Sequence, residues 1–120
     1  FIASKECSAH INFKNKVLAA KEGDTMLSLK ELTAVRLLKN SFYNQVVEAE
    51  NRGDSIEDLK TLLGRGRAKK GMFLGEVEEG ELEVGQVSAS INEILSVSEI
   101  IDEIMIEFNT EKQRVSEIKL

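Results

Sequence analysis

Four stretches of this chain repeat apolar residues every three or four positions, the spacing that puts side chains on one face of an α-helix. They predict helices over residues 8–22, 32–52, 56–64 and 97–118. The chain has no proline, so no backbone N–H group that a long helix needs is missing. The sequence therefore predicts a mainly α fold with a few short β-strands.

Cap residues support several of these helix ends. Ser8 is a candidate N-cap for the first helix, in which Lys14 lies on a basic face, and Gly23 is a candidate C-terminal residue. The last helix begins at a capping box, Ser96 to Glu99. The apolar stripe of the second helix consists of Val35, Leu38, Phe42, Val46 and Ala49, and that of the last helix of Val97, Ile100, Ile101, Ile104, Met105 and Phe108.

Strand content is expected in only three places. Two are the 24–29 region and the 82–84 region. The third is Phe1-Ile2-Ala3, which has the character of the last residues of a buried β-strand. A strand needs partners to satisfy its backbone groups, so this start predicts that the chain is the C-terminal piece of a larger enzyme.

Length and composition limit the possible partners. The 120 residues predict one domain, and the net charge of −5 argues against a nucleic-acid partner. No apolar run is long enough to cross a bilayer, so no membrane partner is expected. The single cysteine, Cys7, excludes an intramolecular disulfide and predicts a cytoplasmic location.

Cys7 and His10 have the spacing of a metal-ligand pair. A zinc site needs three or four protein ligands, and these are the only cysteine and the only histidine. A Cys-His nucleophile pair would also need a third group to orient it. A structural role at the entry of the first helix is therefore the favoured interpretation, and no metal is predicted.

Two charged segments are candidates for binding a ligand. The first, Gly64 to Gly71, carries four positive charges in six residues, but it lacks the Lys-Ser/Thr ending of a phosphate-binding P-loop. The second, Glu76 to Glu83, lacks the alternating Asp/Asn pattern of a calcium-binding loop. A solvated basic turn balanced by a solvated acidic loop is favoured, and phosphate or an acidic partner is the alternative.

A family resemblance covers essentially all of the chain. Residues 1–10, Phe-Ile-Ala-Ser-Lys-Glu-Cys-Ser-Ala-His, resemble the segment that follows the last barrel strand in the nitronate monooxygenase (2-nitropropane dioxygenase) family. That family includes the FMN-dependent enoyl-acyl-carrier-protein reductases. Similar landmarks continue in order at Lys14–Leu18, Asp24-Thr25, Val35–Asn40, Gly71–Gly80 and Val84-Gly85-Gln86.

The resemblance implies a parent fold and a division of this chain. The parent would be an α/β TIM-type barrel that holds FMN at the C-terminal mouth of its strands and carries an inserted helical domain. Residues 1–3 would end the last barrel strand, residues 4–72 would form the inserted domain, and residues 73–120 would return to the barrel as its closing helices. The family's phosphate-binding turn and catalytic histidine would both lie upstream, so no catalytic residue is expected in this chain.

One family position at the active-site mouth is expected here, the cofactor-binding pair Gly85-Gln86. The sequence departs from the family pattern at Val84, at Ser88-Ala89 and at 30–33, where Lys-Glu-Leu-Thr replaces the His-Phe-Gly-His of many reductases. These departures weaken the carrier-protein reductase subtype. They favour a nitronate monooxygenase, which oxidises nitronates with O₂, or an uncharacterised oxidoreductase, with a small molecule as substrate.

Two expectations concern the chain by itself. The isolated chain should not hold FMN tightly, and it should be inactive. The helix from Val97 to Phe108 would bury its stripe against strands that this chain lacks, so the chain is expected to form a homo-oligomer. The alternative to an oxidoreductase is a stand-alone helical protein-interaction module with no activity.

Overall fold

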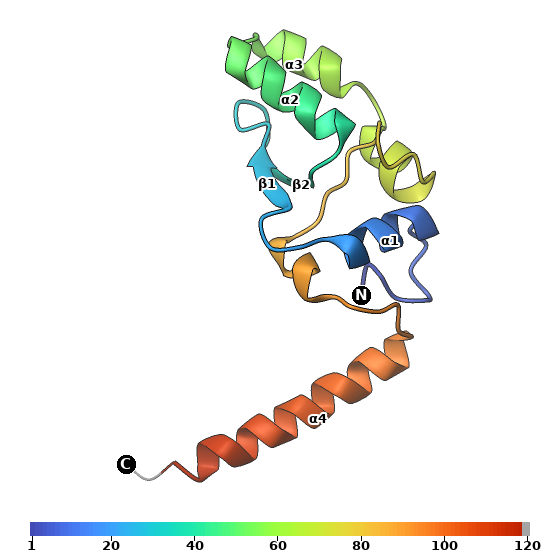
Figure 1. Cartoon of the computed structure of the whole chain (residues 1–120), viewed down its shortest axis with the longest axis vertical. Coiled ribbons are helices and arrows are strands. Elements are labelled where there is room, and N and C mark those ends of the chain that lie inside the picture. Colours follow the sequence, from blue (N-terminus) through green and yellow to red (C-terminus); the bar gives the residue numbers. More distant parts are fainter. Residues whose placement is uncertain (119–120) are drawn as a thin grey trace.

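The structure is a computed structural model and describes residues 1–118. It is mainly helical with one two-stranded sheet, and a long C-terminal helix projects away from the rest of the chain (Figure 1). The elements follow in the order α1 (Ile11–Ala19), β1 (Thr25–Ser28), β2 (Val35–Leu38), α2 (Ser41–Arg52), α3 (Ile56–Leu63), a short π-helix η1 (Lys69–Phe73), a 3₁₀ helix η2 (Gln86–Ser90) and α4 (Val97–Ser116).

Two apolar clusters hold the body together. One packs Phe13 and Val17 of α1 against Leu38 and Leu82, with small side chains filling the gaps. The other joins Leu37 of β2 to Phe42 and Val46 of α2. β2 contributes neighbouring residues to both clusters because successive side chains of a strand point to opposite faces. The division of the chain at residues 72 and 73 stays a prediction.

The prediction of a helix over 32–52 was wrong for residues 32–40. Val35–Leu38 is a strand that pairs antiparallel with β1, with Ser28 opposite Val35 and Thr25 opposite Leu38. The helix begins at Ser41 because Asn40 caps it, its Oδ1 accepting from the Tyr43 N–H at 2.8 Å. The apolar spacing across residues 35–42 suits a buried strand followed by a capped helix as well as one helix, and pairing with β1 decided between them.

The first helix is shorter than predicted. Its N-cap is His10 and not Ser8, and its C-cap is Ala20, so Gly23 lies in the following turn. Lys14 is buried and does not lie on a solvated basic face. Its Nζ donates to the carbonyl oxygens of Ser4 at 2.6 Å and Cys7 at 2.8 Å, which ties the N-terminal turn to α1.

The remaining elements match the sequence predictions in part. α3 and α4 agree with the predicted helices within two residues, and β1 lies inside the predicted 24–29 region. Residues 82–84 make only one isolated bridge, between Leu37 and Glu83. Residues 1–3 form no strand within the described residues 1–118, where residues 2–3 form a turn. Their assignment to the last barrel strand of a parent enzyme stays a prediction.

The capping box predicted at the start of α4 is present, and α4 then runs for 20 residues with none of them buried. Hydrogen bonds from Ser96 lower the pKa of Glu99 to about 2, with Lys5 adding a salt bridge.

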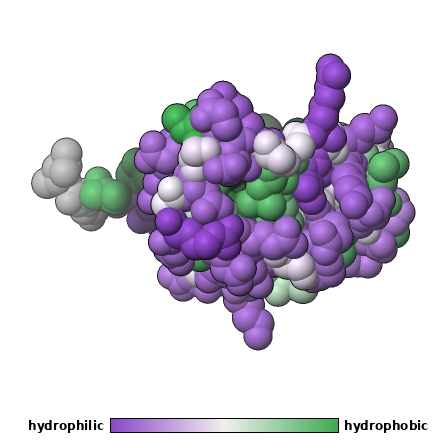
Figure 2. All heavy atoms as spheres, turned by 90° about the horizontal axis from the view of Figure 1, so that it is seen from above, coloured by the Kyte–Doolittle hydropathy of each residue, from purple (hydrophilic) through white to green (hydrophobic). Residues whose placement is uncertain are grey.

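The surface at the α2–α3 end of the molecule is mainly hydrophilic around a small hydrophobic area (Figure 2). Within residues 1–118, no helix is both long enough and apolar enough to cross a membrane.

Candidate functional site

The pair Gly85-Gln86 lies on open surface at the start of η2. The preceding residue, Val84, donates a hydrogen bond from its N–H to the Arg36 carbonyl at 3.2 Å. This bond anchors Gly85-Gln86 to β2. A Cβ built on Gly85 would meet nothing within 4 Å. Both residues are exposed, and the Gln86 side chain makes no hydrogen bond to the part of the chain that the structure describes. The Gly85 backbone and the Gln86 side-chain amide are therefore accessible to a ligand.

These two residues fit a contact with the edge of a flavin ring. An open glycine lets a planar ring approach the backbone, and a free glutamine amide can both donate and accept hydrogen bonds. They do not form a phosphate cradle, because η2 is a single short helix. Among residues 1–118 the site thus offers ring contacts only, and the cofactor's phosphate would have to be held by other residues.

The core side of η2, which packs against α1, contains a buried hydroxyl group. The Ser88 Oγ is buried and has no hydrogen-bond partner within the described residues. Its backbone is satisfied, since the Ser88 N–H donates to the Gly85 carbonyl at 3.1 Å. An unpaired buried hydroxyl costs free energy that an alanine would not.

We expect Ser88→Ala to raise the free energy of unfolding by about 1 kcal/mol, because it removes the desolvation cost of that hydroxyl. Urea unfolding followed by circular dichroism measures the change. The exposed Ser90→Ala on the same short helix is the matched control and should change little. A loss of stability in Ser88→Ala would contradict this prediction and would show that the hydroxyl is bonded, for example to a water molecule.

In the basic segment Gly64–Gly71, Arg67 makes structural contacts. Arg67 donates to the carbonyl oxygens of Leu62 at 2.7 Å, Leu63 at 3.0 Å and Glu79 at 3.0 Å. Its guanidinium also lies 4.6 Å from the centroid of the Phe42 ring. Arg67 therefore closes the C-terminal end of α3 and is not available to hold a phosphate.

The acidic segment Glu76–Glu83 is also engaged with its neighbours. Glu78 forms a salt bridge with Lys16 at 2.6 Å and accepts from the Ser41 hydroxyl at 3.1 Å, and these bonds lower its pKa. Burial raises the pKa of Glu81, with Glu83 adding to the shift and Arg67 opposing it. Residues 1–118 contain no group of three or more candidate metal ligands.

Cys7 and His10 have structural roles. The His10 Nδ1 accepts from the Asn12 N–H at 3.1 Å and so caps α1. The His10 ring lies directly against Gly75, whose φ of +77° is in the left-handed region. The Cys7 carbonyl accepts from Lys14. The favoured interpretation of this pair as part of the helix entry agrees with these contacts.

Sequence reasoning missed Asn40, which joins two distant segments. While its Oδ1 caps α2, its Nδ2 donates to the carbonyl oxygens of Val77 and Gly80, both at 2.8 Å. The Asn40-Ser41 pair before an apolar helix was the available signal for the cap. No sequence signal pointed to the two carbonyl partners, which lie 37 and 40 residues away.

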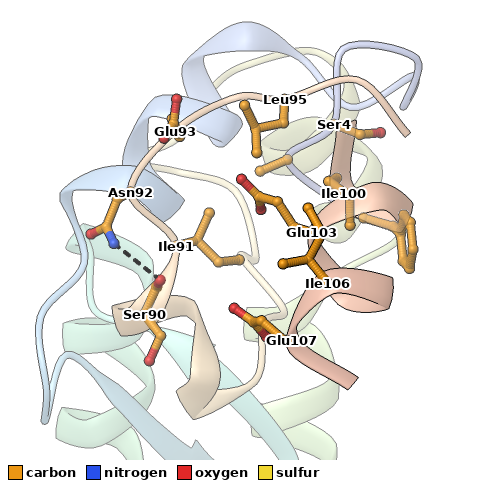
Figure 3. Close-up of a pocket in the computed structure, with 12 residues that line it drawn as sticks. Ser4, Ser90, Ile91, Asn92, Glu93, Leu95, Ile100, Glu103, Ile106 and Glu107 are labelled. Carbon is orange, nitrogen blue, oxygen red and sulfur yellow. Dashed lines mark hydrogen bonds between the residues drawn. The ribbon is translucent and has the colours of Figure 1, made fainter. Parts of the chain in front are cut away.

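A cleft of about 550 Å³ lies between the N-terminal turn, the segment from Ser90 to Leu95 and the first half of α4. Figure 3 shows Ile91 and Leu95 on one side and Ile100, Glu103, Ile106 and Glu107 of α4 on the other. The cleft is lined by neither Gly85 nor Gln86. It is therefore separate from the predicted flavin contacts.

The fold and the open Gly-Gln turn can be compared with known proteins. The family model for nitronate monooxygenase matches residues 1–107. Among solved structures, FabK from Thermotoga maritima has a TM-score of 0.85 and 28% sequence identity, over 96% of this chain and 36% of the FabK chain. A point mutant of the same FabK has a TM-score of 0.78 and 25% identity, over 96% and 34%.

The match across residues 1–107 shows the class, a family of FMN-dependent oxidoreductases. This chain belongs to the nitronate monooxygenase family. It spans about a third of the length of the FabK chains that it matches.

Proposed function

We propose that this chain is the C-terminal part of an FMN-dependent oxidoreductase that oxidises small nitronates with O₂. The observation that carries the proposal is the match of the nitronate monooxygenase family model to residues 1–107. The match of 96% of the chain to 36% of FabK at a TM-score of 0.85 supports its place within a longer flavoenzyme. The remaining two thirds of such an enzyme would supply the TIM-type barrel and the phosphate-binding turn. The exposed stripe of α4 agrees with a missing surface.

In this enzyme, Gly85 and Gln86 would contact the edge of the isoalloxazine ring. Bound FMN would supply the electron transfer, and the protein would position the substrate against the ring. The Gly85 backbone allows close approach, and the free Gln86 amide orients a polar ring edge or a substrate oxygen. The bond from Val84 to β2 and the packing of η2 on α1 hold the pair in place.

The connection between β1 and β2 favours nitronate oxidation over enoyl reduction. Residues 30–33 lie there, and they replace the two histidines of the reductase pattern with Lys30 and Thr33. Lys30 and Glu31 line a shallow depression shared with Gly53–Ile56. The histidines of that reductase pattern are therefore absent from this connection.

A second candidate function is a helical interaction module without activity. The observation in its favour is α4, which has no buried residue and shows a row of apolar side chains. The two functions differ in whether the chain completes a flavin site when the rest of an enzyme of this family is present.

The first expected result concerns the chain alone. The 120-residue chain should not retain FMN through gel filtration and should show no nitronate-dependent oxygen uptake, because it lacks a phosphate cradle. The visible flavin spectrum and an oxygen electrode measure the two properties. Stoichiometric FMN retention by the chain alone would contradict this prediction.

The complementary sample is a chimera in which this chain replaces the matching third of Thermotoga FabK. It should show a bound-flavin spectrum and nitronate-dependent oxygen uptake. Gln86→Ala in the chimera should lower that uptake about tenfold, the loss of one hydrogen bond, while the exposed Gln45→Ala should not. A folded chimera without flavin would favour the interaction module. A flavin-bound chimera without uptake would contradict the nitronate assignment only.

A further inference from the structure

Lys14 of α1 is a buried charged side chain to which the proposed function gives no role. The residue is 6% exposed, and its Nζ donates to the carbonyl oxygens of Ser4 at 2.6 Å and Cys7 at 2.8 Å. Within residues 1–118, Lys14 forms no salt bridge with a carboxylate. A buried charge is costly unless it is well bonded, so the two carbonyl oxygens and the ammonium group depend on one another.

These hydrogen bonds fix the N-terminal segment, residues 1–7, to α1. The segment makes two turns, in which the Ser4 N–H donates to the Phe1 carbonyl at 2.9 Å and the Cys7 N–H donates to the Ser4 carbonyl at 3.3 Å. The turns bring the Ser4 and Cys7 carbonyls close enough together for one ammonium group to bond both. An apolar side chain in place of Lys14 would leave both bonds unmade.

The candidate flavin contact, Gly85-Gln86, rests on the same helix. η2 packs against α1, and the residues on either side of η2 belong to one apolar cluster with α1 and the N-terminal segment (Figure 1). In that cluster, Val84 and Ile91 pack with Phe13 of α1 and with Ala3. α1 therefore contacts both the N-terminal segment and the short helix that begins at the Gly-Gln pair.

We propose that Lys14 is a positioning residue for the cofactor, which sets Gly85-Gln86 relative to the N-terminal segment by fixing α1 to that segment. The inference rests on the proposed function, in which residues 1–3 continue from the barrel and Gly85-Gln86 contact the flavin ring. The barrel would hold the rest of the cofactor, so the ring contacts need a set position relative to residues 1–7.

Lys14 would act through Gln86 and not by touching FMN. Its Nζ is bonded to two carbonyls of the chain, and its side chain is buried. A hydrogen bond weakens steeply when its geometry is poor, so a displaced Gln86 amide would lose most of its contribution to binding. Lys14 and Gln86 should therefore be energetically coupled in FMN binding, although neither bonds the other.

FMN binding by the FabK chimera, measured by flavin fluorescence titration of the apoprotein, tests this coupling. Four chimeras form a double-mutant cycle: the unchanged one, Gln86→Ala, Lys14→Met and the double variant. Gln86→Ala should raise the Kd for FMN about tenfold when Lys14 is present, and by less than about twofold in Lys14→Met. An equal effect of Gln86→Ala in both backgrounds would overturn the positioning role and leave the proposed function intact.

Lys16→Met provides the matched control. Lys16 lies two residues away on α1, and the same substitution there removes only its salt bridge with Glu78. In this background, Gln86→Ala should keep its tenfold effect. A loss of the coupling in Lys16→Met as well would show that any change in α1 displaces the pair, and it would overturn the assignment to Lys14.

Circular dichroism of each chimera separates misfolding from loss of positioning. If Lys14→Met does not fold, Lys14→Gln replaces it in the cycle, because its amide can still donate to one carbonyl from a shorter side chain. An undiminished effect of Gln86→Ala in Lys14→Gln would then overturn the proposal. An unchanged chimera that folds but binds no FMN would overturn the proposed function and this inference together.

Discussion

Gly80→Ala is expected to lower the free energy of unfolding of this chain by about 3 kcal/mol. A Cβ at Gly80 would overlap the backbone N and Cα of Gly71, and it would lie 2.9 Å from the Glu76 carbonyl oxygen. These neighbours are backbone atoms, which cannot rotate away as a side chain could. The turn also cannot shift freely, since Asn40 holds the Gly80 carbonyl at 2.8 Å.

Urea unfolding followed by far-UV circular dichroism measures this effect. All variants should be compared at one protein concentration. The control is Gly85→Ala, at a glycine with an ordinary φ of −71° and nothing within 4 Å of a built Cβ. Equal midpoints for the two variants would show that the close approach of Gly71 and Gly80 is absent in solution.

Arg67→Met is expected to cost about 3 kcal/mol of stability. The substitution keeps an unbranched apolar side chain over the Phe42 ring but removes the donors to three carbonyl oxygens. Two of those carbonyls end α3 and would lose the partner that satisfies them. Arg67→Lys should recover only part of the loss, because an ammonium group does not have the fork of donors that reaches three acceptors.

The same unfolding experiment tests Arg67, and Arg65 provides the control. Arg65 is exposed, is two positions away and makes none of these contacts, so Arg65→Met should change stability by less than about 0.5 kcal/mol. If instead both variants were equally stable and both had lost affinity for phosphate, the segment would be a phosphate site and not a structural clamp.

The elements that the sequence predicted best are those with local signals. α3 and α4 each carry a capping box and an uninterrupted apolar spacing, and both formed within two residues of the predicted bounds. β2 had no such signal, because Val35 and Leu38 fit the helical spacing of the following segment. Only its pairing with β1 made it a strand.

The sequence nominated the candidate site but did not predict its surroundings. The resemblance placed Gly85-Gln86 at a cofactor, and the structure shows both residues open at the start of η2, while their contact with FMN stays a prediction. The roles of Lys14, Asn40 and Arg67 were not predictable. Each is a polar side chain bonded to backbone carbonyls of another segment, and which carbonyls come within reach depends on how the segments pack.

The amino-acid sequence by itself determined the helical character, the caps of α3 and α4 and the family. These depend on spacing and on neighbours within one helical turn, or on the order of motifs along the chain. Tertiary structure alone decided the β1–β2 pair, the close approach of Gly71 to Gly80 and the burial of Lys14. Those features require contacts between atoms of distant segments. The free energy of these tertiary contacts outweighs the weaker helix and strand propensities of each segment alone.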